Sequence, residues 1–250
     1  MAELARTIRM EVMRYHPETD DTPRFQSYAV PFVDDTSVLQ GLQHIKDRLD
    51  GTLTFRWSCR MAVCGSCGIM VDGVPHLSCK TFLRDFADGV RIEPLNHFPI
   101  ERDLAVDQSD FVAKLEAAKP WIIPAEERPL SAGPHRQTPA ELERFRQYSQ
   151  CINCLLCYAA CPQYGLNREF TGPGILALIH RYNADSRDAG KRERMDIVNA
   201  EEGVWGCTLV GYCSEVCPKS VDPAHAVNEN KVASALDYFL GFLAPRGMRE

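Results

Sequence analysis

The stretch that decides the fold of this chain is Cys59-Arg-Met-Ala-Val-Cys64-Gly-Ser-Cys67. Four residues separate its first two cysteines, two separate the next pair, and eleven more lie before Cys79. Gly65 allows the backbone to approach a bound group closely, because glycine has no Cβ. A C-x4-C-x2-C loop with a distant fourth cysteine is the plant-type spacing for a [2Fe–2S] cluster. The sequence therefore predicts that the thiolates of residues 59–79 hold such a cluster.

Zinc is the main alternative at these four cysteines. Structural zinc sites usually combine two C-x2–4-C units or include histidine. Here a single loop precedes one isolated cysteine, and no histidine lies in the loop, which also argues against a Rieske centre. The spacing therefore favours [2Fe–2S] over zinc at Cys59, Cys64, Cys67 and Cys79.

Two further cysteine runs lie in the second half of the chain. Residues 151–162 read CINCLLCYAACP, which matches in full the C-x2-C-x2-C-x3-C-P run of bacterial ferredoxins. Residues 207–218 read CTLVGYCSEVCP, and Val210 stands where the second cysteine of such a run belongs. The third run is thus one thiolate short of a full set.

The spacing rule of two-cluster ferredoxins divides these cysteines between two clusters. In those proteins the cysteine before the proline binds the other cluster. The rule predicts a [4Fe–4S] cluster on one set of four thiolates and a [3Fe–4S] cluster on the remaining three. The first set is Cys151, Cys154, Cys157 and Cys217, and the second set is Cys161, Cys207 and Cys213. All 11 cysteines of the chain are then used. The alternative is that Val210 only packs beside an incomplete [4Fe–4S] cluster, whose fourth iron is held by water or another side chain.

Composition and charge exclude several other classes of protein. The 250 residues suffice for two domains of roughly 100–150 residues each. The net charge of -6 argues against a nucleic-acid partner. Residues 1–15 lack the apolar core of a secretory signal, and no stretch approaches the roughly 18–20 apolar residues that span a bilayer. Without an export signal, many cysteines indicate metal ligands rather than disulfides.

The first part of the chain is predicted to be a small sheet around one helix. Apolar and polar residues alternate in short runs, as in half-buried strands, and Asp72-Gly73 separates two such runs as a hairpin turn does. Apolar residues then recur at helical spacing over 38–49, after a Thr36 or Ser37 cap. The predicted strands lie near residues 8–12, 25–30, 68–71, 74–77 and 90–95, and the predicted helix buries Val38, Leu42, Ile45 and Leu49.

The second part is predicted to be helical. Thr138-Pro139-Ala140-Glu141 supplies an N-cap, a proline at the first helical position and the acid of a capping box. Pro173 and Pro223 open two further helices, the second running to about Leu243. Prolines and glycines break up the segment before the capping box, which has little periodicity. The predicted division is a domain at 1–106, a connecting segment at 107–137 and a domain at 138–250.

Taken together, these motifs resemble the iron–sulfur subunits of succinate dehydrogenases and fumarate reductases over nearly the whole chain. In that family the N-terminal domain is a β-grasp ferredoxin and the C-terminal domain is helical. The resemblance therefore implies an α+β fold, with a β-grasp plant-type [2Fe–2S] domain followed by an all-helical, bacterial-ferredoxin-like domain. The stretches that carry it are WSCRMAVCGSCG (57–68), HFPIERDLAVD (97–107), QTPAE (137–141), CINCLLCYAACP (151–162), RYNADSRD (181–188) and WGCTLVGYCSEVCPK (205–219).

The resemblance implies electron transfer and assigns the carbon chemistry to another subunit. Electrons would pass from quinol at membrane anchor subunits to the FAD of a flavoprotein subunit, in the order [3Fe–4S], [4Fe–4S], [2Fe–2S]. No catalytic residue is then expected on this chain. It would lie peripherally at the cytoplasmic face of the inner membrane, held by the anchors. Family position also implies that Lys231 lies near the menaquinone site and hydrogen-bonds a quinone carbonyl; a solvated helix face is the alternative.

Within the family the sequence resembles quinol:fumarate reductase. Residues 162–167 read PQYGLN, and Gly165 and Leu166 stand where many succinate dehydrogenases carry a tryptophan of the ubiquinone pocket. The first cysteine group is also complete, whereas some relatives use an aspartate there. We therefore expect fumarate reduction with menaquinol. Succinate dehydrogenase is the alternative, and a ferredoxin-like partner of another flavin enzyme is a third class.

Overall fold

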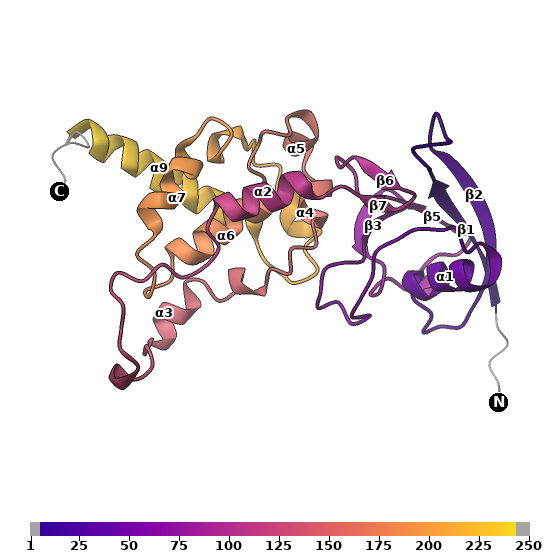
Figure 1. Cartoon of the computed structure of the whole chain (residues 1–250), viewed down its shortest axis with the longest axis horizontal. Helices are drawn as coiled ribbons and strands as arrows, with labels where there is room; N and C mark the ends of the chain where they lie inside the picture. The colour runs from indigo at the N-terminus through magenta and orange to yellow at the C-terminus, as the bar shows by residue number, and fades with distance from the viewer. Residues whose placement is uncertain (1–5, 244–250) are drawn as a thin grey trace. The chain divides into compact units, whose positions relative to one another are not determined.

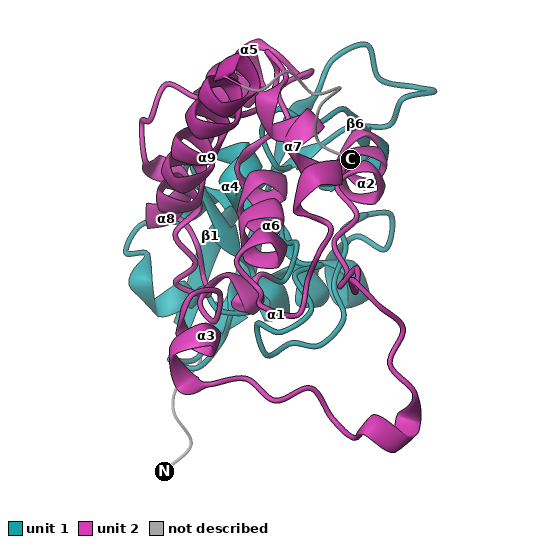
Figure 2. Ribbon diagram, turned by 90° about the vertical axis from the view of Figure 1, so that its left-hand side faces the viewer, with its two compact units in different colours: residues 1–109, 152–160 teal, residues 110–151, 161–250 magenta. Residues whose placement is uncertain are grey.

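The computed structural model of the protein describes residues 6–243. The outer ends of the two predicted domains, at 1–5 and 244–250, lie outside the described residues. The chain divides into two compact units (Figure 2). Unit 1 consists of Met1–Ser109 and Ile152–Ala160, and unit 2 consists of Asp110–Cys151 and Cys161–Glu250.

A five-stranded mixed sheet forms the centre of unit 1 (Figure 1). Its strand order is β2-β1-β5-β3-β4, with β1 antiparallel to β2 and parallel to β5. Asp72 and Gly73 both have positive φ, 47° and 78°, as a two-residue hairpin turn requires. The predicted strands and hairpin are confirmed. The strands are β1 (Arg6–Arg14), β2 (Arg24–Phe32), β3 (Gly68–Val71), β4 (Val74–Leu77) and β5 (Val90–Glu93), and β6 (Ile100–Arg102) and β7 (Ala105–Val106) form a separate hairpin.

The predicted helix covers this sheet but ends differently from the expectation. Helix α1 (Val38–His44) begins at a Ser37 capping box and continues as a π-helix, Ile45–Leu49. Leu49, which we expected to be buried, is half exposed. Hydrogen bonds in a π-helix span five residues instead of four, so its last residue turns away from the buried face. The other predicted core residues, Val38, Leu42 and Ile45, are fully buried.

A buried ion pair joins the end of β1 to the turn between β6 and β7, which in turn binds the segment that leads into the first cysteine loop. Arg14 Nε donates to Asp103 Oδ1 at 2.9 Å, and Arg14 Nη1 donates to Tyr28 Oη at 2.7 Å. The Asp103 carboxylate also accepts the backbone N–H groups of Tyr15 and Thr54, at 3.0 and 2.8 Å. Because buried charges are stable only when they are paired, this network fixes the start of that segment.

Unit 2 is built from helices, as predicted. Thr138 caps α3 in a capping box with Glu141, and the helices predicted from Pro173 and Pro223 both form. Helix α6 packs along α9, and α6 buries a larger share of its residues than α9 does. The helices are α2 (Ser109–Ala117), α3 (Pro139–Glu143), α5 (Pro162–Leu166), α6 (Pro173–Asn183), α7 (Lys191–Asn199), α8 (Tyr212–Glu215) and α9 (Pro223–Leu243).

Helix α2 lies within the predicted connecting segment, where the sequence shows little periodicity. Its start is fixed by Asp107, whose Oδ1 accepts the Ser109 N–H at 2.8 Å. Phe111 is its one buried residue, so no apolar stripe marks the helix in the sequence. Lys114 instead ties it down with hydrogen bonds from Nζ to Asp110 Oδ2 at 2.9 Å and to the carbonyl oxygen of Phe170 at 3.2 Å.

Candidate iron–sulfur centres

The first cysteine loop turns backbone N–H groups toward the sulfur of Cys59. The N–H groups of Met61, Val63 and Cys64 donate to Cys59 Sγ at 3.4, 3.3 and 3.3 Å. Arg60 adopts a left-handed φ of 59° to make this turn, a conformation that few non-glycine residues adopt. Several N–H donors around one sulfur stabilise a thiolate more than a neutral thiol, because hydrogen bonds to a charged acceptor are stronger.

The remaining cysteines of the first group lie in contact with this loop. The Ser66 hydroxyl and the Cys59 N–H hydrogen-bond the Cys64 sulfur and lower the pKa of its thiol to about 6. Cys67 Sγ lies 3.3 Å from Cys79 Sγ. Burial, and then the hydrogen bond with Cys67, raises the pKa of Cys79 to about 11. The four predicted ligands are therefore neighbours, and their donor set fits an iron–sulfur cluster.

The first turn of the second cysteine run packs directly on this loop, within unit 1. A Cβ at Gly65 would lie 2.4 Å from the carbonyl oxygen of Ile152, and one at Gly68 would lie 2.8 Å from that of Cys154. Only glycine allows such an approach of two backbones. Helix α4 (Leu156–Ala159) follows and contains Cys157. Two of the four predicted [4Fe–4S] ligands thus belong to unit 1.

The other two predicted ligands of that cluster, Cys151 and Cys217, belong to unit 2. Both pack against one buried cluster of side chains, which spans the segment before Cys151, helix α6 and the start of α9. This packing fixes both cysteines against the same part of unit 2. The members of the cluster are Tyr148, Ala177, Val221 and Ala226.

The three cysteines predicted to hold the [3Fe–4S] cluster affect one another's ionisation in unit 2. Burial, and then the charges of Cys161 and Cys207, raises the pKa of the Cys213 thiol to about 11. Burial and the charge of Cys207 likewise raise the pKa of Cys161. The Leu209 N–H donates to Cys207 Sγ at 3.4 Å. Such crowded thiols hold their protons until a metal displaces them, which fits a shared metal cluster.

The second and third cysteine runs share one backbone shape. In the second run the residues two and four places after the first cysteine, Asn153 and Leu155, have left-handed φ values of 52° and 66°. In the third run the corresponding residues, Leu209 and Gly211, have φ values of 62° and 84°. Asparagine and glycine tolerate this conformation, but the two leucines are strained in it. The repeated strain marks both runs as functional loops.

Val210 of the third run stands at the position where the second run has a predicted ligand, Cys154. A short helix starts at the fifth position after the first cysteine of each run, α4 in one and α8 in the other. Between the two left-handed residues stands Cys154 in the second run and Val210 in the third. Val210 is 62% exposed. The third run therefore repeats the backbone of the predicted ligand loop, with one thiol replaced by a side chain that cannot bind iron.

Lys231 of α9 lies beside the third run. Its Nζ donates to the carbonyl oxygen of Cys207 at 2.8 Å and lies 5.7 Å from the ring centroid of Trp205. Trp205 Nε1 donates to Ser234 Oγ at 3.1 Å, which fixes the indole on the same helix. The ammonium of Lys231 thus contacts the ligand segment. Its contact with a quinone stays a prediction, and Trp205 was not singled out from the sequence because no spacing marks it.

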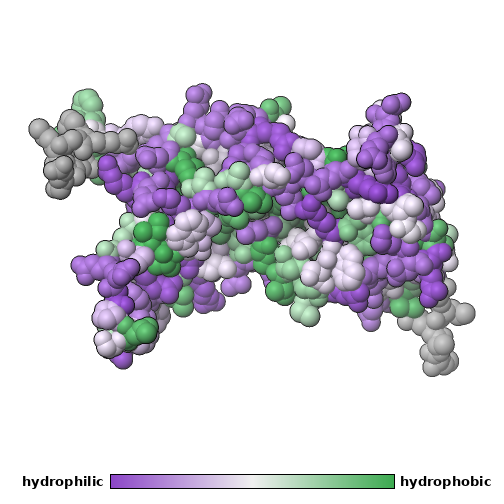
Figure 3. All heavy atoms as spheres, in the orientation of Figure 1, coloured by the Kyte–Doolittle hydropathy of each residue, from purple (hydrophilic) through white to green (hydrophobic). Residues whose placement is uncertain are grey.

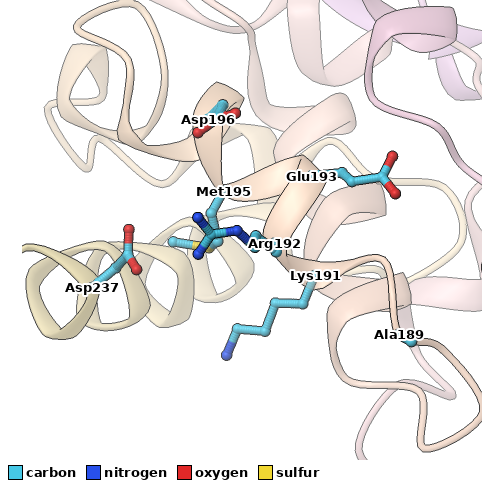
Figure 4. A pocket seen from close by; sticks show the side chains of 7 residues that line it. All are labelled: Ala189, Lys191, Arg192, Glu193, Met195, Asp196 and Asp237. Atoms are coloured by element: carbon cyan, nitrogen blue, oxygen red, sulfur yellow. The ribbon is translucent and has the colours of Figure 1, made fainter. Parts of the chain in front are cut away.

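A concave surface of unit 2, between α7 and α9, contains none of the predicted site residues. Its volume is about 650 Å³ and its walls carry charges of both signs (Figure 4). Among residues 6–243, no group of three or more His, Cys, Asp or Glu side chains is arranged around a single metal ion. This finding does not conflict with the predicted clusters, because the ligands of a polynuclear cluster bind separate iron atoms. The cavity is lined by Ala189, Lys191, Arg192, Glu193, Met195, Asp196 and Asp237.

Apolar side chains reach the surface in several places (Figure 3). In unit 2 a row of them follows one side of α9, at the helical spacing of a single stripe. No helix within the described part of the chain is long and apolar enough to cross a membrane. We call this row the α9 stripe; it consists of Val232, Leu236, Phe239, Leu240 and Leu243.

Comparison with known proteins agrees with this geometry. Residues 9–113 match the family described as 2Fe-2S iron-sulfur cluster binding domain, and residues 144–218 match the family described as 4Fe-4S dicluster domain. The fumarate reductase iron-sulfur subunit of Haemophilus influenzae is 56% identical over 96% of this chain and 98% of its own length. The chain belongs to the fumarate reductase and succinate dehydrogenase iron–sulfur subunits.

Other members of this family are more distant. The succinate dehydrogenase iron-sulfur subunit of Coxiella burnetii is 35% identical over 87% of this chain and 93% of its own length. A chain of the Mycobacterium smegmatis Sdh1 complex in the apo form superposes with a TM-score of 0.83 at 25% identity, covering 94% of this chain and 98% of that one. The predicted fold class is confirmed, and the family matches bear out iron–sulfur clusters as the cofactors instead of zinc.

Proposed function

We propose that this chain is the electron-transfer subunit of a membrane-associated quinol:fumarate reductase. The observation that carries the proposal is the third cysteine run, which repeats the backbone shape of the second but has Val210 in place of a ligand. When bound, iron–sulfur clusters accept and release single electrons. The chain's own residues would hold the thiolates in place, direct N–H groups at their sulfurs and keep water from them. No residue of this chain is assigned to the dicarboxylate chemistry.

The proposed ligand sets follow the cysteine spacing and are supported by the contacts within each unit. The first group holds [2Fe–2S], the mixed set holds [4Fe–4S], and the three crowded thiols of unit 2 hold [3Fe–4S]. These sets are Cys59, Cys64, Cys67 and Cys79; Cys151, Cys154, Cys157 and Cys217; and Cys161, Cys207 and Cys213. The functional division proposed is 1–106 for the [2Fe–2S] domain, 107–137 for the connecting segment and 138–250 for the domain with the other two clusters.

The proposed partners are a flavoprotein subunit with FAD and one or more membrane anchor subunits. The α9 stripe supports an anchor contact, because an apolar row of this length is rarely left in water. The contact of Lys231 with the Cys207 segment supports a place for quinone, with menaquinone favoured, beside this end of unit 2. The chain would then lie peripherally at the cytoplasmic face of the inner membrane.

Fumarate reduction is favoured over succinate oxidation by similarity. The fumarate reductase subunits compared with this chain are 54–56% identical to it, whereas the succinate dehydrogenase subunits are 34–35% identical. Gly165 and Leu166 in α5 agree with this preference. Rates of fumarate reduction by menaquinol and of succinate oxidation by quinone, measured on the purified complex, separate the two candidates.

Metal and sulfide analysis of the purified complex tests the proposal. We expect about nine iron atoms and about ten inorganic sulfides per copy of this chain, for three clusters of two, four and three irons. Electron paramagnetic resonance (EPR) of the air-oxidised complex should show a three-iron signal that disappears on mild reduction. Zinc without labile sulfide would contradict the iron–sulfur assignment, and a full set of clusters without a three-iron signal would contradict the role of Val210.

A further inference from the structure

A histidine and a tyrosine connect the core around two predicted [4Fe–4S] ligands to solvent. Tyr148 is 1% exposed and belongs to the buried cluster against which Cys151 and Cys217 pack. Its hydroxyl lies 2.7 Å from Nδ1 of His225, a residue in the first turn of α9. The His225 side chain is 54% exposed. A short hydrogen-bonded path therefore runs from the core that holds two cysteines to the surface of unit 2.

The titratable groups near the His225–Tyr148 pair lie on α9, just before its start and on α6. On its own helix, Glu229 Oε1 lies 3.9 Å from His225 Nε2, and the backbone N–H of His225 donates to Asp222 Oδ1 at 2.9 Å. Opposite, the ring of His180 on α6 stands edge-on to Tyr148 with 4.7 Å between ring centroids. Burial lowers the pKa of His180, with smaller effects from Glu229, His225 and Lys191, which favours the neutral form of His180.

The hydroxyl of Tyr148 can only act as a neutral group. Burial, and then the charges of Asp222 and Glu229, raises the pKa of Tyr148. When the imidazole of His225 is uncharged, the Tyr148 O–H can donate to its Nδ1, and Nε2–H then faces Glu229. When the imidazole takes up a proton, Nδ1–H donates to the tyrosine oxygen instead. The hydroxyl proton of Tyr148 then turns away from Nδ1.

We infer that His225 couples proton uptake to reduction of the [4Fe–4S] cluster held by Cys151, Cys154, Cys157 and Cys217. When one electron is added at that site, the imidazole takes one proton from solvent, and it releases this proton when the electron leaves. Negative charge added beside Tyr148 favours the positive imidazolium at the other end of the hydrogen bond, because opposite charges attract and Tyr148, which lies between them, is buried. Histidine is the side chain whose charge changes between about pH 5 and about pH 8. The inference rests on the proposed function.

Redox titration of the complex, followed by EPR of the reduced cluster, tests this inference. In the wild type the midpoint potential should fall as the pH rises from about 6 to about 8. We expect at least a threefold change in the one-electron reduction equilibrium, which is about 28 mV at 59 mV per factor of ten. His225→Gln keeps a polar side chain without the charge, and its potential should no longer vary over this range. Tyr148→Phe keeps the ring but removes the hydroxyl that hydrogen-bonds His225, and it should weaken the pH dependence of the potential.

The control is His135→Gln, which removes an exposed histidine elsewhere in unit 2 and should leave the wild-type pH dependence intact. A pH-independent potential in the wild type, or a His225→Gln complex with the wild-type dependence, would overturn the inference. Iron, sulfide and EPR signals of the wild type are measured first. A complex without three clusters contradicts the proposed function and this inference together, whereas three clusters with a flat pH response contradict only the inference.

Discussion

At the residue scale, Val210 is the side chain that we propose decides the type of the third cluster. Its neighbours on both sides have the left-handed backbone that flanks Cys154 in the second run, so the loop retains a ligand's geometry without the ligand. A backbone that already fits a thiol needs no rearrangement to accept one. The chemistry at this position is therefore set by the side chain alone.

Val210→Cys should convert the three-iron site to [4Fe–4S]. We expect the iron content to rise by about one per chain, the three-iron EPR signal to vanish, and quinol-dependent turnover to fall because the potential at that site drops. Val210→Ala is the matched control, since it removes the same side chain without adding a thiol and should keep the three-iron signal. A Val210→Cys complex with the wild-type signal and turnover would show that Val210 is only a packing residue.

At the element scale, helix α7 holds the connecting segment through one buried arginine. Arg194 is fully buried, and its guanidinium donates to the carbonyl oxygens of Lys119 and Trp121 at 3.2 and 2.8 Å. It also pairs with Asp188 at 2.7 and 2.9 Å. Burial disfavours the charged carboxylate, but the hydrogen bonds from Arg194 and from the Ile123 and Gly190 N–H groups outweigh it and lower the pKa of Asp188.

Arg194→Met should destabilise unit 2 by about 3–5 kcal/mol, because it leaves a buried carboxylate without its partner. Urea unfolding followed by circular dichroism measures the loss, and limited trypsin digestion should cut faster after Lys119 and Arg128. The matched control is Arg192→Met on the same helix, where the side chain is exposed and the change should stay within about 0.5 kcal/mol. Equal losses in the two variants would contradict the role of the buried pair.

The Arg194–Asp188 pair predicts that unit 2 loses stability in acid. The pKa of Asp188 is lower in the folded protein than in the unfolded chain, where it is about 3.9. Its stabilising effect is therefore complete above about pH 4 and is lost as the pH falls through the depressed folded value. Wild-type stability should drop steeply below about pH 4, whereas the Arg194→Met variant, which has already lost the pair, should show a shallower drop in the same urea titration.

At the scale of the whole molecule, the α9 stripe should decide where the complex is found. Leu236→Glu places a charge in its middle and should cost on the order of 2 kcal/mol in anchor binding, roughly 30-fold in dissociation constant. Fractionation should then find the chain released from membranes with its iron and sulfide unchanged. Leu130→Glu, at a fully exposed leucine of the connecting segment, is the control and should remain bound. If Leu130→Glu released the chain from membranes and Leu236→Glu did not, the assignment of the α9 stripe to anchor binding would be contradicted.

Local signals in the sequence predicted the strands, the hairpin, the Thr138 capping box, a cap on the first helix and the long helices, because these depend on residues near one another in the chain. Helix α2 escaped prediction since one buried phenylalanine leaves no apolar stripe, and Leu49 was misplaced because a π-turn changes the helical period. The cysteine spacing also identified the candidate ligands, but it did not predict which residues between them adopt a left-handed backbone. Nor did it indicate the contact of His225 with Tyr148, because their side chains meet through packing that no local pattern encodes.

Residues Ile152–Ala160 belong to the same unit as the sheet, although 42 residues of the other unit, Asp110–Cys151, come between them in the chain. During synthesis at about 5–20 residues per second, the N-terminal unit must therefore wait several seconds on the ribosome for its last segment. Until then, Gly65 and Gly68 face water where Ile152 and Cys154 later pack. The first cysteine loop therefore lacks these backbone contacts until the second cysteine run has emerged.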